Sequence, residues 1–203
     1  MNNTRLFYQA KEKALQNLKK AQEKENVDRK VKSLLDILNG SELYYTLSSC
    51  SGRIVLLEIP DLGDKQQAYF LGKWHQIITI ADVQQALESS SKGTLWFLAQ
   101  SPIFHVGVSS LEDADDLVKI GIASGFKNSG IRSIKPRFIV ELCSTERLDA
   151  PIGKQGTIYG ENEYLELLTQ IANQILQRSQ EKLHRLEKKL RKHLSTQKST
   201  NTQ

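Results

Sequence analysis

The chain has 203 residues, enough for one domain with a sizeable core and too few for two domains of ordinary size. Hydrophobic residues make up 39% and charged residues 25%, which is an ordinary globular composition. No stretch approaches the roughly 18 apolar residues of a membrane helix, and the polar first twenty residues predict no signal peptide. Two cysteines are too few for a disulfide framework, so we expect a reducing, cytoplasmic setting.

Positive charge is concentrated at the two ends of the chain. Residues 1–32 carry a net charge of +5 and residues 178–203 carry +6, whereas residues 33–177 carry −6. Clustered lysine and arginine side chains attract a nucleic-acid phosphate backbone, because binding releases its counterions. The same residues are common on exposed helix faces, so charge alone leaves an RNA interface and a plain solvated surface equally open.

Hydrophobic spacing in the first half of the chain predicts helices and then strands. Apolar residues at three- and four-residue spacing predict an amphipathic helix over about residues 4–23, and the pattern resumes at Val31 until Asn39 and Gly40 end it. A short helix is expected to begin at Thr79. Runs rich in β-branched and aromatic residues predict strands over residues 53–59, 69–78, 94–99 and 103–108.

The second half begins with a helix that has clear signals at both ends. Ser110 is a good N-cap with Asp113 three residues later, and Gly125 is a plausible stop. The elements predicted after it are strands over residues 131–134 and 138–142, a loop containing Pro151, Gly153 and Gly156, and a long helix over about 162–194. The basic end of that helix is either a projecting arm or a dimer contact, which leaves the oligomeric state open. Residues 195–203 are expected to be a disordered tail.

Several familiar chemical signatures are missing from the sequence. No glycine-rich dinucleotide loop follows a strand, and there is no phosphate loop. The four histidines and two cysteines have no metal-ligand spacing, so we expect no metal site. Pattern and composition alone therefore indicate an intracellular α+β domain with basic ends.

Short motifs in a fixed order add a resemblance. Residues 48–54 read SSCSGRI, and residues 125–131 read GFKNSGI. The flanking blocks are His75, His105-Val106, Pro151 with Gly156, Glu163-Tyr164 and Ala172-Asn173. Together these blocks extend from about residue 5 to residue 190, and they resemble the wybutosine-synthesis methyltransferase family. Some members of that family carry an arginine where this chain has Cys143, so no role of that arginine is transferred here.

The resemblance implies a specific reaction and fold. Members of the family transfer a methyl group from S-adenosylmethionine to N4 of a demethylwyosine-type base at position 37 of tRNA(Phe), so the partner is the anticodon loop of that tRNA. The implied fold is α+β and not Rossmann-like, with a strongly bent, barrel-like mixed β-sheet, helices packed outside it and a long C-terminal helix. We expect residues 1–194 to form a single methyltransferase domain.

Methyl transfer to a ring nitrogen requires alignment of the reacting atoms and removal of one proton. His75 and His105 are the candidate bases because imidazole titrates near neutral pH, although each can instead be a structural histidine. Ser49 and Cys50 are also predicted to belong to the catalytic site. Because nitrogen methylation needs no covalent nucleophile, Cys50 is expected to line the site rather than to attack.

The candidate ligand-binding residues come from the same motifs. Arg53 is predicted to hold a carboxylate, of the cofactor or of the modified base, unless it forms a structural ion pair. The other predicted cofactor-binding residues are Ser48, Asn128, Ser129 and Gly130. The alternative for Asn128 is a tight turn with the residue in the left-handed conformation. We expect the catalytic and cofactor-binding residues to converge on one pocket.

Separate residues are predicted to contact RNA. Trp74 can stack on an extruded base, although core packing is an equal alternative. The final helix presents Arg185, Lys188, Lys189 and Lys192 on one side, where they can contact phosphates. Two rival functions stay open: a non-enzymatic RNA-binding module and a hydrolase that uses Cys50 with a histidine.

Overall fold

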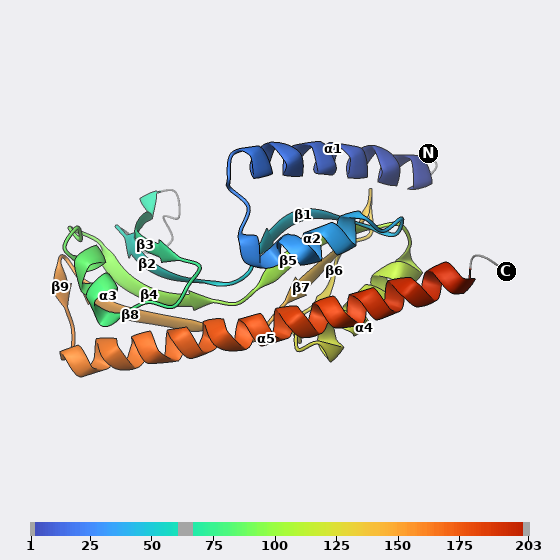
Figure 1. Ribbon diagram of the computed structural model, residues 1–203. Coiled ribbons are helices and arrows are strands. Elements are labelled where there is room, and N and C mark those ends of the chain that lie inside the picture. The colour runs from blue at the N-terminus through green and yellow to red at the C-terminus, as the bar shows by residue number, and fades with distance from the viewer. Residues whose placement is uncertain (1–2, 61–66, 201–203) are drawn as a thin grey trace. The chain divides into compact units, whose positions relative to one another are not determined.

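The computed structural model of the chain describes residues 3–60 and 67–200 (Figure 1). These residues form two compact units, each with its own sheet and core. Unit 1 comprises residues 1–51, 102–145 and 180–203, and unit 2 comprises residues 52–101 and 146–179. The last helix, α5 (Asn162–Thr200), contributes its first part to unit 2 and its second part to unit 1.

Unit 1 combines a four-stranded antiparallel sheet with helices. Its helices are α1 (Asn3–Glu23), the short 3₁₀ helix η1 (Arg29–Val31), α2 (Lys32–Asn39), α4 (Leu111–Ala123) and the second part of α5. Its strands are β1 (Tyr44–Cys50), β5 (Ile103–Val108), β6 (Gly130–Ser133) and β7 (Phe138–Cys143), in the spatial order β1-β5-β7-β6. The predicted signals of α4 are confirmed, since the Ser110 hydroxyl accepts a hydrogen bond from the Asp113 N–H at 3.0 Å and Gly125 has φ +101°.

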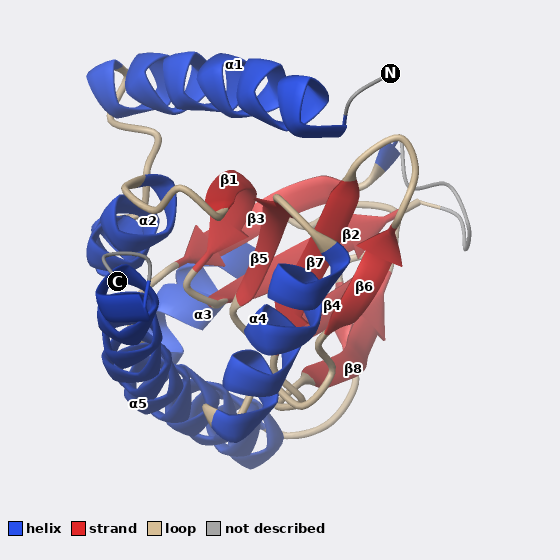
Figure 2. Cartoon of the chain, turned by 90° about the vertical axis from the view of Figure 1, so that its right-hand side faces the viewer, coloured by secondary structure: helices blue, strands red, loops and turns tan. Residues whose placement is uncertain are grey.

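One face of this sheet forms the core of unit 1. Alternate residues of β5 and β7, among them Phe104 and Leu142, are fully buried with leucines of α2, α4 and α5. Figure 2 shows α4 lying along the sheet, in agreement with its contacts to β7. Burial of these apolar side chains supplies the main driving force for folding of the unit.

Among the described residues of unit 1, helix α1 contacts the opposite face of the same sheet at β1 and β5. The ring of Phe7 on α1 contacts the ring of Tyr45 edge-on, with 5.3 Å between the ring centroids. The Tyr45 ring in turn lies over Gly107, where an added Cβ would come within 2.0 Å of it. Ser48 and His105 follow along β1 and β5 on this face.

Unit 2 is built on a curled five-stranded antiparallel sheet. Its strands are β2 (Arg53–Ile59), β3 (Tyr69–Trp74), β4 (Thr94–Gln100), β8 (Leu148–Lys154) and β9 (Thr157–Ile158), in the order β3-β2-β4-β8-β9. Register shifts at Leu56/Leu57 and at Leu95/Trp96 interrupt the ladders, and such bulges bend a sheet. Helix α3 (Ile80–Leu87) has a capping box between Thr79 and Asp82. Leucines and isoleucines of α3 and of the first part of α5 complete the core.

The α+β class, the bent sheet and the long C-terminal helix are confirmed, and no Rossmann-like arrangement occurs among the described residues. Every pairing between described strands is antiparallel, so the strands divide between two antiparallel sheets rather than forming one mixed sheet. The segment predicted as a loop around Pro151 and Gly153 is the strand β8. Pro151 is tolerated there because it lies at the register shift opposite Trp96, where the ladder is interrupted.

The long helix continues beyond its predicted end at residue 194. It reaches Thr200, so residues 195–200 are helical rather than disordered, and residues 201–203 lie outside the described part. The hydroxyls of Ser195 and Thr196 donate hydrogen bonds to the Lys192 carbonyl at 2.8 and 3.1 Å. Both hydroxyls therefore bond back to the preceding turn of the helix.

Candidate active site

A row of polar residues crosses the open face of the unit 1 sheet. Strand register places Ser48 opposite His105, His105 opposite Glu141, and Glu141 opposite Gly130. Paired residues in adjacent antiparallel strands point to the same side of the sheet. The register shift between Thr46 and Ser48 brings Ser48 to this side. Strand pairing thus gathers residues from four strands into one row.

The side chains of this row form a continuous hydrogen-bond chain. Ser48 Oγ lies 2.8 Å from His105 Nδ1, and His105 Nε2 lies 3.0 Å from Glu141 Oε2. The other carboxylate oxygen of Glu141 accepts a hydrogen bond from the Arg132 guanidinium. Because an ionised carboxylate only accepts, His105 donates from Nε2. In the neutral imidazole, Nδ1 is then the acceptor for the Ser48 hydroxyl.

Glu141 is held in its ionised form. The hydrogen bond from Arg132 lowers the pKa of Glu141 below its ordinary value, burial opposes the shift, and His105 adds to it. The Glu141 side chain is 11% exposed, whereas the His105 side chain is 34% exposed. The chain of bonds therefore runs from a buried anion to groups that solvent and ligands can reach.

The motif around Asn128 borders the end of β7. The Asn128 N–H donates to the Cys143 carbonyl at 3.0 Å, and the Ser129 hydroxyl donates to the Phe126 carbonyl at 2.6 Å and accepts from the Cys143 N–H at 3.2 Å. Ser129 therefore holds its own loop in place. The side chain of Asn128 is exposed and has no hydrogen-bond partner among the described residues. Its φ is not positive, which contradicts the alternative of a left-handed turn residue.

The remaining residues of the serine-rich motif lie on different faces of β1. Ser49 pairs with Phe104, whose ring is in the core, so it lies on the face opposite His105. Cys50 pairs with Ile103, which also pairs with Cys143. Cys50 and Cys143 form no disulfide with each other, and both are half-buried. They flank a central strand, and two strand spacings of about 5 Å each put their Cα atoms beyond disulfide reach.

Arg53 and His75 belong to unit 2. Arg53 Nε donates to Gln100 Oε1 at 2.6 Å, and its Cζ lies 5.9 Å from the centroid of the Phe70 ring. No carboxylate of the described residues pairs with Arg53, so the alternative of a structural ion pair is contradicted. His75 Nδ1 lies 3.0 Å from the Gly52 carbonyl, and that contact requires Nδ1 to carry the proton.

Trp74 packs inside unit 2. Its ring lies over Gly72, where an added Cβ would come within 1.9 Å of the ring, and it is half-buried against the core. Core packing accounts for this side chain, and stacking on RNA stays a prediction.

The predicted basic side of α5 is exposed in unit 1. Arg185, Lys188, Lys189 and Lys192 are exposed, whereas Leu183, Leu186 and Leu190 are buried in the core. Arg185 Nε also donates to the Ser124 carbonyl at 3.3 Å. Lys182, from the same basic run, is 8% exposed, and its ammonium donates to the Ser144 hydroxyl at 2.8 Å. Lys182 therefore has a structural role.

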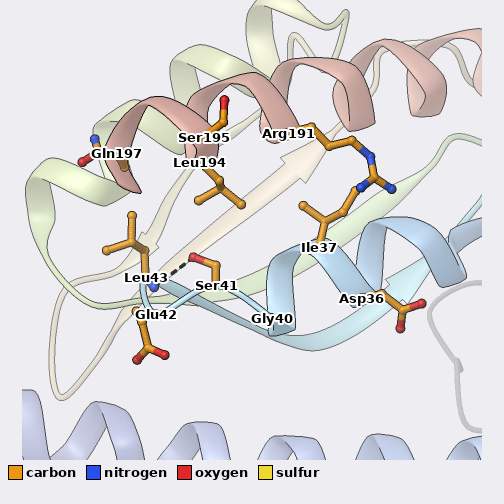
Figure 3. A pocket seen from close by; sticks show the side chains of 10 residues that line it. All are labelled: Asp36, Ile37, Gly40, Ser41, Glu42, Leu43, Arg191, Leu194, Ser195 and Gln197. Atoms are coloured by element: carbon orange, nitrogen blue, oxygen red, sulfur yellow. Dashed lines mark hydrogen bonds between the residues drawn. The ribbon is translucent and has the colours of Figure 1, made fainter. Parts of the chain in front are cut away.

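Unit 1 also has a cavity of about 500 Å³, whose lining residues are drawn in Figure 3. Ile37, Gly40 and Leu43 line it from the end of α2 and the following turn, and Leu194 lines it from α5. None of the predicted site residues lines it. Within residues 3–60 and 67–200, no group of three potential ligands could hold a metal ion, and no helix is both long and apolar enough to cross a membrane.

Sequence reasoning missed Glu141 and Arg132. The signal for Glu141 is present, because it is the one charged residue in the otherwise apolar run FIVELC of β7. An isolated carboxylate within a strand has to find partners, and here they are His105 and Arg132. The sequence alone does not show which of the histidines pairs with Glu141.

Comparisons with known proteins agree with the predicted resemblance. The model of a family described as Methyltransferase TYW3 matches residues 9–192. A protein of Pyrococcus horikoshii named tRNA(Phe) 7-((3-amino-3-carboxypropyl)-4-demethylwyosine(37)-N(4))-methyltransferase 1 is 46% identical over 191 residues, covering 94% of this chain and 97% of the relative. A Thermococcus sibiricus protein with the same name, without the final number, is 44% identical, covering 90% of this chain and 93% of the relative.

Solved structures match in fold as well. The structure of PH1069 protein from Pyrococcus horikoshii superimposes with a TM-score of 0.89 at 46% identity, covering 94% of this chain and 98% of that one. A hypothetical protein from Aeropyrum pernix, 27% identical, gives a TM-score of 0.70 and covers 80% of this chain and 96% of its own. Because the family match spans both units, the chain belongs to the Methyltransferase TYW3 family.

Proposed function

We propose that the chain methylates N4 of the demethylwyosine-type base at position 37 of tRNA(Phe), with S-adenosylmethionine as the methyl donor. The names of relatives 44% and 46% identical over nearly the whole chain support this reaction. The observation that carries the proposal is the Ser48–His105–Glu141 chain of hydrogen bonds. It links a serine of the matched motif to a base and a buried carboxylate on an open sheet face.

Exposed polar side chains of the chain suit two ligands, a zwitterionic methyl donor and a polar nucleobase. Asn128 offers an exposed amide with no partner among the described residues, suited to the edge of a nucleobase. Arg53 uses Nε for Gln100 and has no partner carboxylate in the described parts of the chain, so its terminal nitrogens suit a ligand carboxylate. That carboxylate belongs either to the donor or to the side chain of the modified base.

The donor supplies an activated methyl group, so the protein has to position the base and take one proton. Ser48 and His105 provide an exposed hydroxyl backed by an imidazole. Gly130, where an added Cβ would meet nothing within 4 Å, leaves open space beside Glu141 for a ligand. We assign Ser129 to shaping the Asn128 loop, because its hydroxyl already makes two hydrogen bonds. His75 and Cys50 stay as predicted members of the site, whereas Ser49 lies on the face opposite His105 and is not assigned to it.

We also propose how the tRNA is bound. The exposed basic residues of α5 contact phosphates of the anticodon arm, and Trp74 remains a candidate for stacking on the extruded base. We infer that residues 1–194 act as one methyltransferase domain, because the family match spans both units. We infer a cytoplasmic location from the tRNA substrate.

The experiment that tests this function uses tRNA(Phe) from cells that lack the N4-methylation step. The chain is incubated with this tRNA and S-adenosylmethionine that carries a deuterated methyl group, and the nucleosides are analysed by mass spectrometry. We expect the label on N4 of the base at position 37. The matched control is tRNA(Phe) that already carries the N4 methyl group, which should acquire no label. Binding of the unmethylated tRNA without any transfer would support the alternative, a non-enzymatic RNA-binding module.

A further inference from the structure

We propose that Glu141 and Arg132 are positioning residues that hold His105 as the acceptor of a proton path starting at Ser48. The inference rests on the proposed methyl transfer and assigns the route by which the proton of N4 leaves. It starts from a feature that the sequence motif does not contain: a buried carboxylate 36 residues beyond His105, held opposite it by the pairing of β5 and β7.

Geometry makes Ser48, and not His105, the group that meets the substrate. Both ring nitrogens of His105 already have partners, Ser48 on Nδ1 and Glu141 on Nε2. The Ser48 residue is exposed, so its oxygen can accept a hydrogen bond from a ligand while its own proton points to Nδ1. Ser48 is therefore the catalytic residue in this path, and His105 acts through it.

As N4 acquires the methyl group, the N4–H bond breaks and its proton forms a new bond to Ser48 Oγ. The original Oγ–H bond breaks, and that proton forms a bond to His105 Nδ1. The positive charge that the methyl donor loses thus ends on the imidazolium, which lies against ionised Glu141. Water takes the proton from the imidazolium after turnover, because the His105 side chain is 34% exposed.

Glu141 and Arg132 act on this step through charge and tautomer. An ionised carboxylate fixes the proton on Nε2 of the neutral imidazole and leaves Nδ1 free to accept. It also stabilises the imidazolium once the proton has moved. Arg132 keeps the carboxylate ionised, since its hydrogen bond is the largest contribution that lowers the pKa of Glu141. If Glu141 and Arg132 had a purely structural role, they would only hold β5, β6 and β7 together.

Glu141→Gln separates the two roles, because glutamine keeps the size and one acceptor but loses the charge. The first readout needs no ligand: the ¹⁵N shifts of the His105 ring in the free chain, which report its tautomer. We expect Nε2 protonated and Nδ1 unprotonated in the wild type, and a mixture of tautomers in the variant. The second readout is turnover, where we expect kcat to fall about 100-fold with little change in KM for tRNA. Glu141→Asp should restore part of kcat.

Glu187→Gln is the matched control. Glu187 is another glutamate of unit 1 that pairs with an arginine, Arg191, at 2.9 Å, and its pKa is also lowered by that arginine. Its replacement should leave the His105 tautomer as in the wild type, and the melting temperature of each variant shows how far its fold is weakened. Ser48→Ala removes only an exposed hydroxyl, so it tests the path even where Glu141→Gln weakens the fold.

The double variant Ser48→Ala/Glu141→Gln gives a further distinction. If both residues serve one proton path, the double variant should be little slower than either single variant. Independent effects that multiply would overturn the path. The path would also be overturned if Glu141→Gln kept the wild-type His105 tautomer and a kcat within threefold of wild type. In that case methyl transfer by the wild type would still support the proposed function. Absence of methyl transfer by the wild type would overturn the proposed function and the path with it.

Discussion

The backbone N–H of Gly93 donates a 2.6 Å hydrogen bond to the buried carboxylate of Glu58. The same carboxylate accepts from the N–H and the hydroxyl of Ser91, at 2.9 and 3.0 Å. The Glu58 carboxylate of β2 thus accepts hydrogen bonds from donors of the turn that leads into β4. Both tryptophans of the chain, Trp74 and Trp96, belong to unit 2, so their fluorescence reports on the unit that contains this contact.

Replacing Glu58 by glutamine should destabilise unit 2. The amide keeps one oxygen acceptor but turns an NH₂ group toward the donors of Ser91 and Gly93, leaving at least one buried N–H without a partner. The expected loss in the free energy of unfolding is about 1–3 kcal/mol. It can be measured by urea unfolding followed by tryptophan fluorescence. Glu166→Gln, at an exposed position of α5, should unfold as the wild type does.

The same contact predicts an acid dependence. Burial alone raises the pKa of Glu58, but the hydrogen bonds from Gly93 and Ser91 outweigh it, so the pKa lies below its ordinary value. A lowered folded-state pKa adds stability that is complete above the ordinary glutamate pKa of about 4.3 and is lost as the pH falls further. We expect the difference in unfolding free energy between wild type and Glu58→Gln to shrink below that pH. An equal difference at neutral and acid pH would contradict this prediction.

Gly93→Ala should also weaken unit 2, for a steric reason. An added Cβ would come within 2.7 Å of both Glu58 Cγ and the Ile59 carbonyl oxygen, and the latter is backbone that cannot move aside. Overpacking of this kind costs about 1–3 kcal/mol. Gly130→Ala is the comparison for folding, because its Cβ would meet nothing within 4 Å. Equal unfolding midpoints for these two variants would show that the turn relaxes without cost.

Local signals were enough to predict the helices. Ser110 with Asp113, and Thr79 with its following turn, are capping patterns that depend on residues three apart, and both occur as predicted. The strand β1 was not predicted, because its polar end Ser48–Cys50 lacks the apolar alternation of a strand. Its pairing with β5 fixes it instead, through contacts far along the chain.

The candidate site could be predicted only in part, for the same reason. The motifs named Ser48 and His105, but their hydrogen bond depends on the register of β1 and β5 and on a bulge between Thr46 and Ser48. Glu141 joins them through a second pairing that no local pattern encodes. Likewise, the sequence suggests that Lys182 is one more basic surface residue, but packing of its helix buries it. Sequence therefore supplied residue types, and strand register decided which of them meet.

Arg53→Ala should weaken binding of S-adenosylmethionine or of the carboxylate-bearing base, with little effect on folding. A charge-assisted hydrogen bond to a carboxylate contributes about 1.5–3 kcal/mol, so the Kd of the affected ligand should rise about 10-fold or more. Calorimetric titration measures the Kd, and tryptophan fluorescence follows unfolding of unit 2. Arg147→Ala is the control, since Arg147 is an exposed arginine of the same unit that already pairs with Asp149. Unchanged affinity for both ligands, with a lowered unfolding midpoint, would show that Arg53 serves only the fold.

The basic side of α5 should contribute a salt-dependent part of tRNA affinity. Truncation before this region would be a poor test, because it would also remove core leucines such as Leu186 and Leu190. Point substitutions avoid that loss, and Arg185 is left unchanged because it also bonds to Ser124. The test variant carries glutamine in place of three exposed lysines, Lys188, Lys189 and Lys192. Its affinity for tRNA(Phe) should fall at low salt, while its affinity for S-adenosylmethionine stays as in the wild type.

The dependence on salt gives this prediction a magnitude. Each neutralised phosphate contributes about 0.7–0.9 to the slope of log affinity against log salt, so loss of three contacts should flatten the slope by about 2–3. The matched control replaces Lys92, Lys119 and Lys154, three exposed lysines outside α5, by glutamine and so makes the same change in net charge. If the control flattens the slope as much as the α5 variant, the tRNA responds to overall charge. A specific effect of the α5 variant would instead show that phosphates bind along this helix.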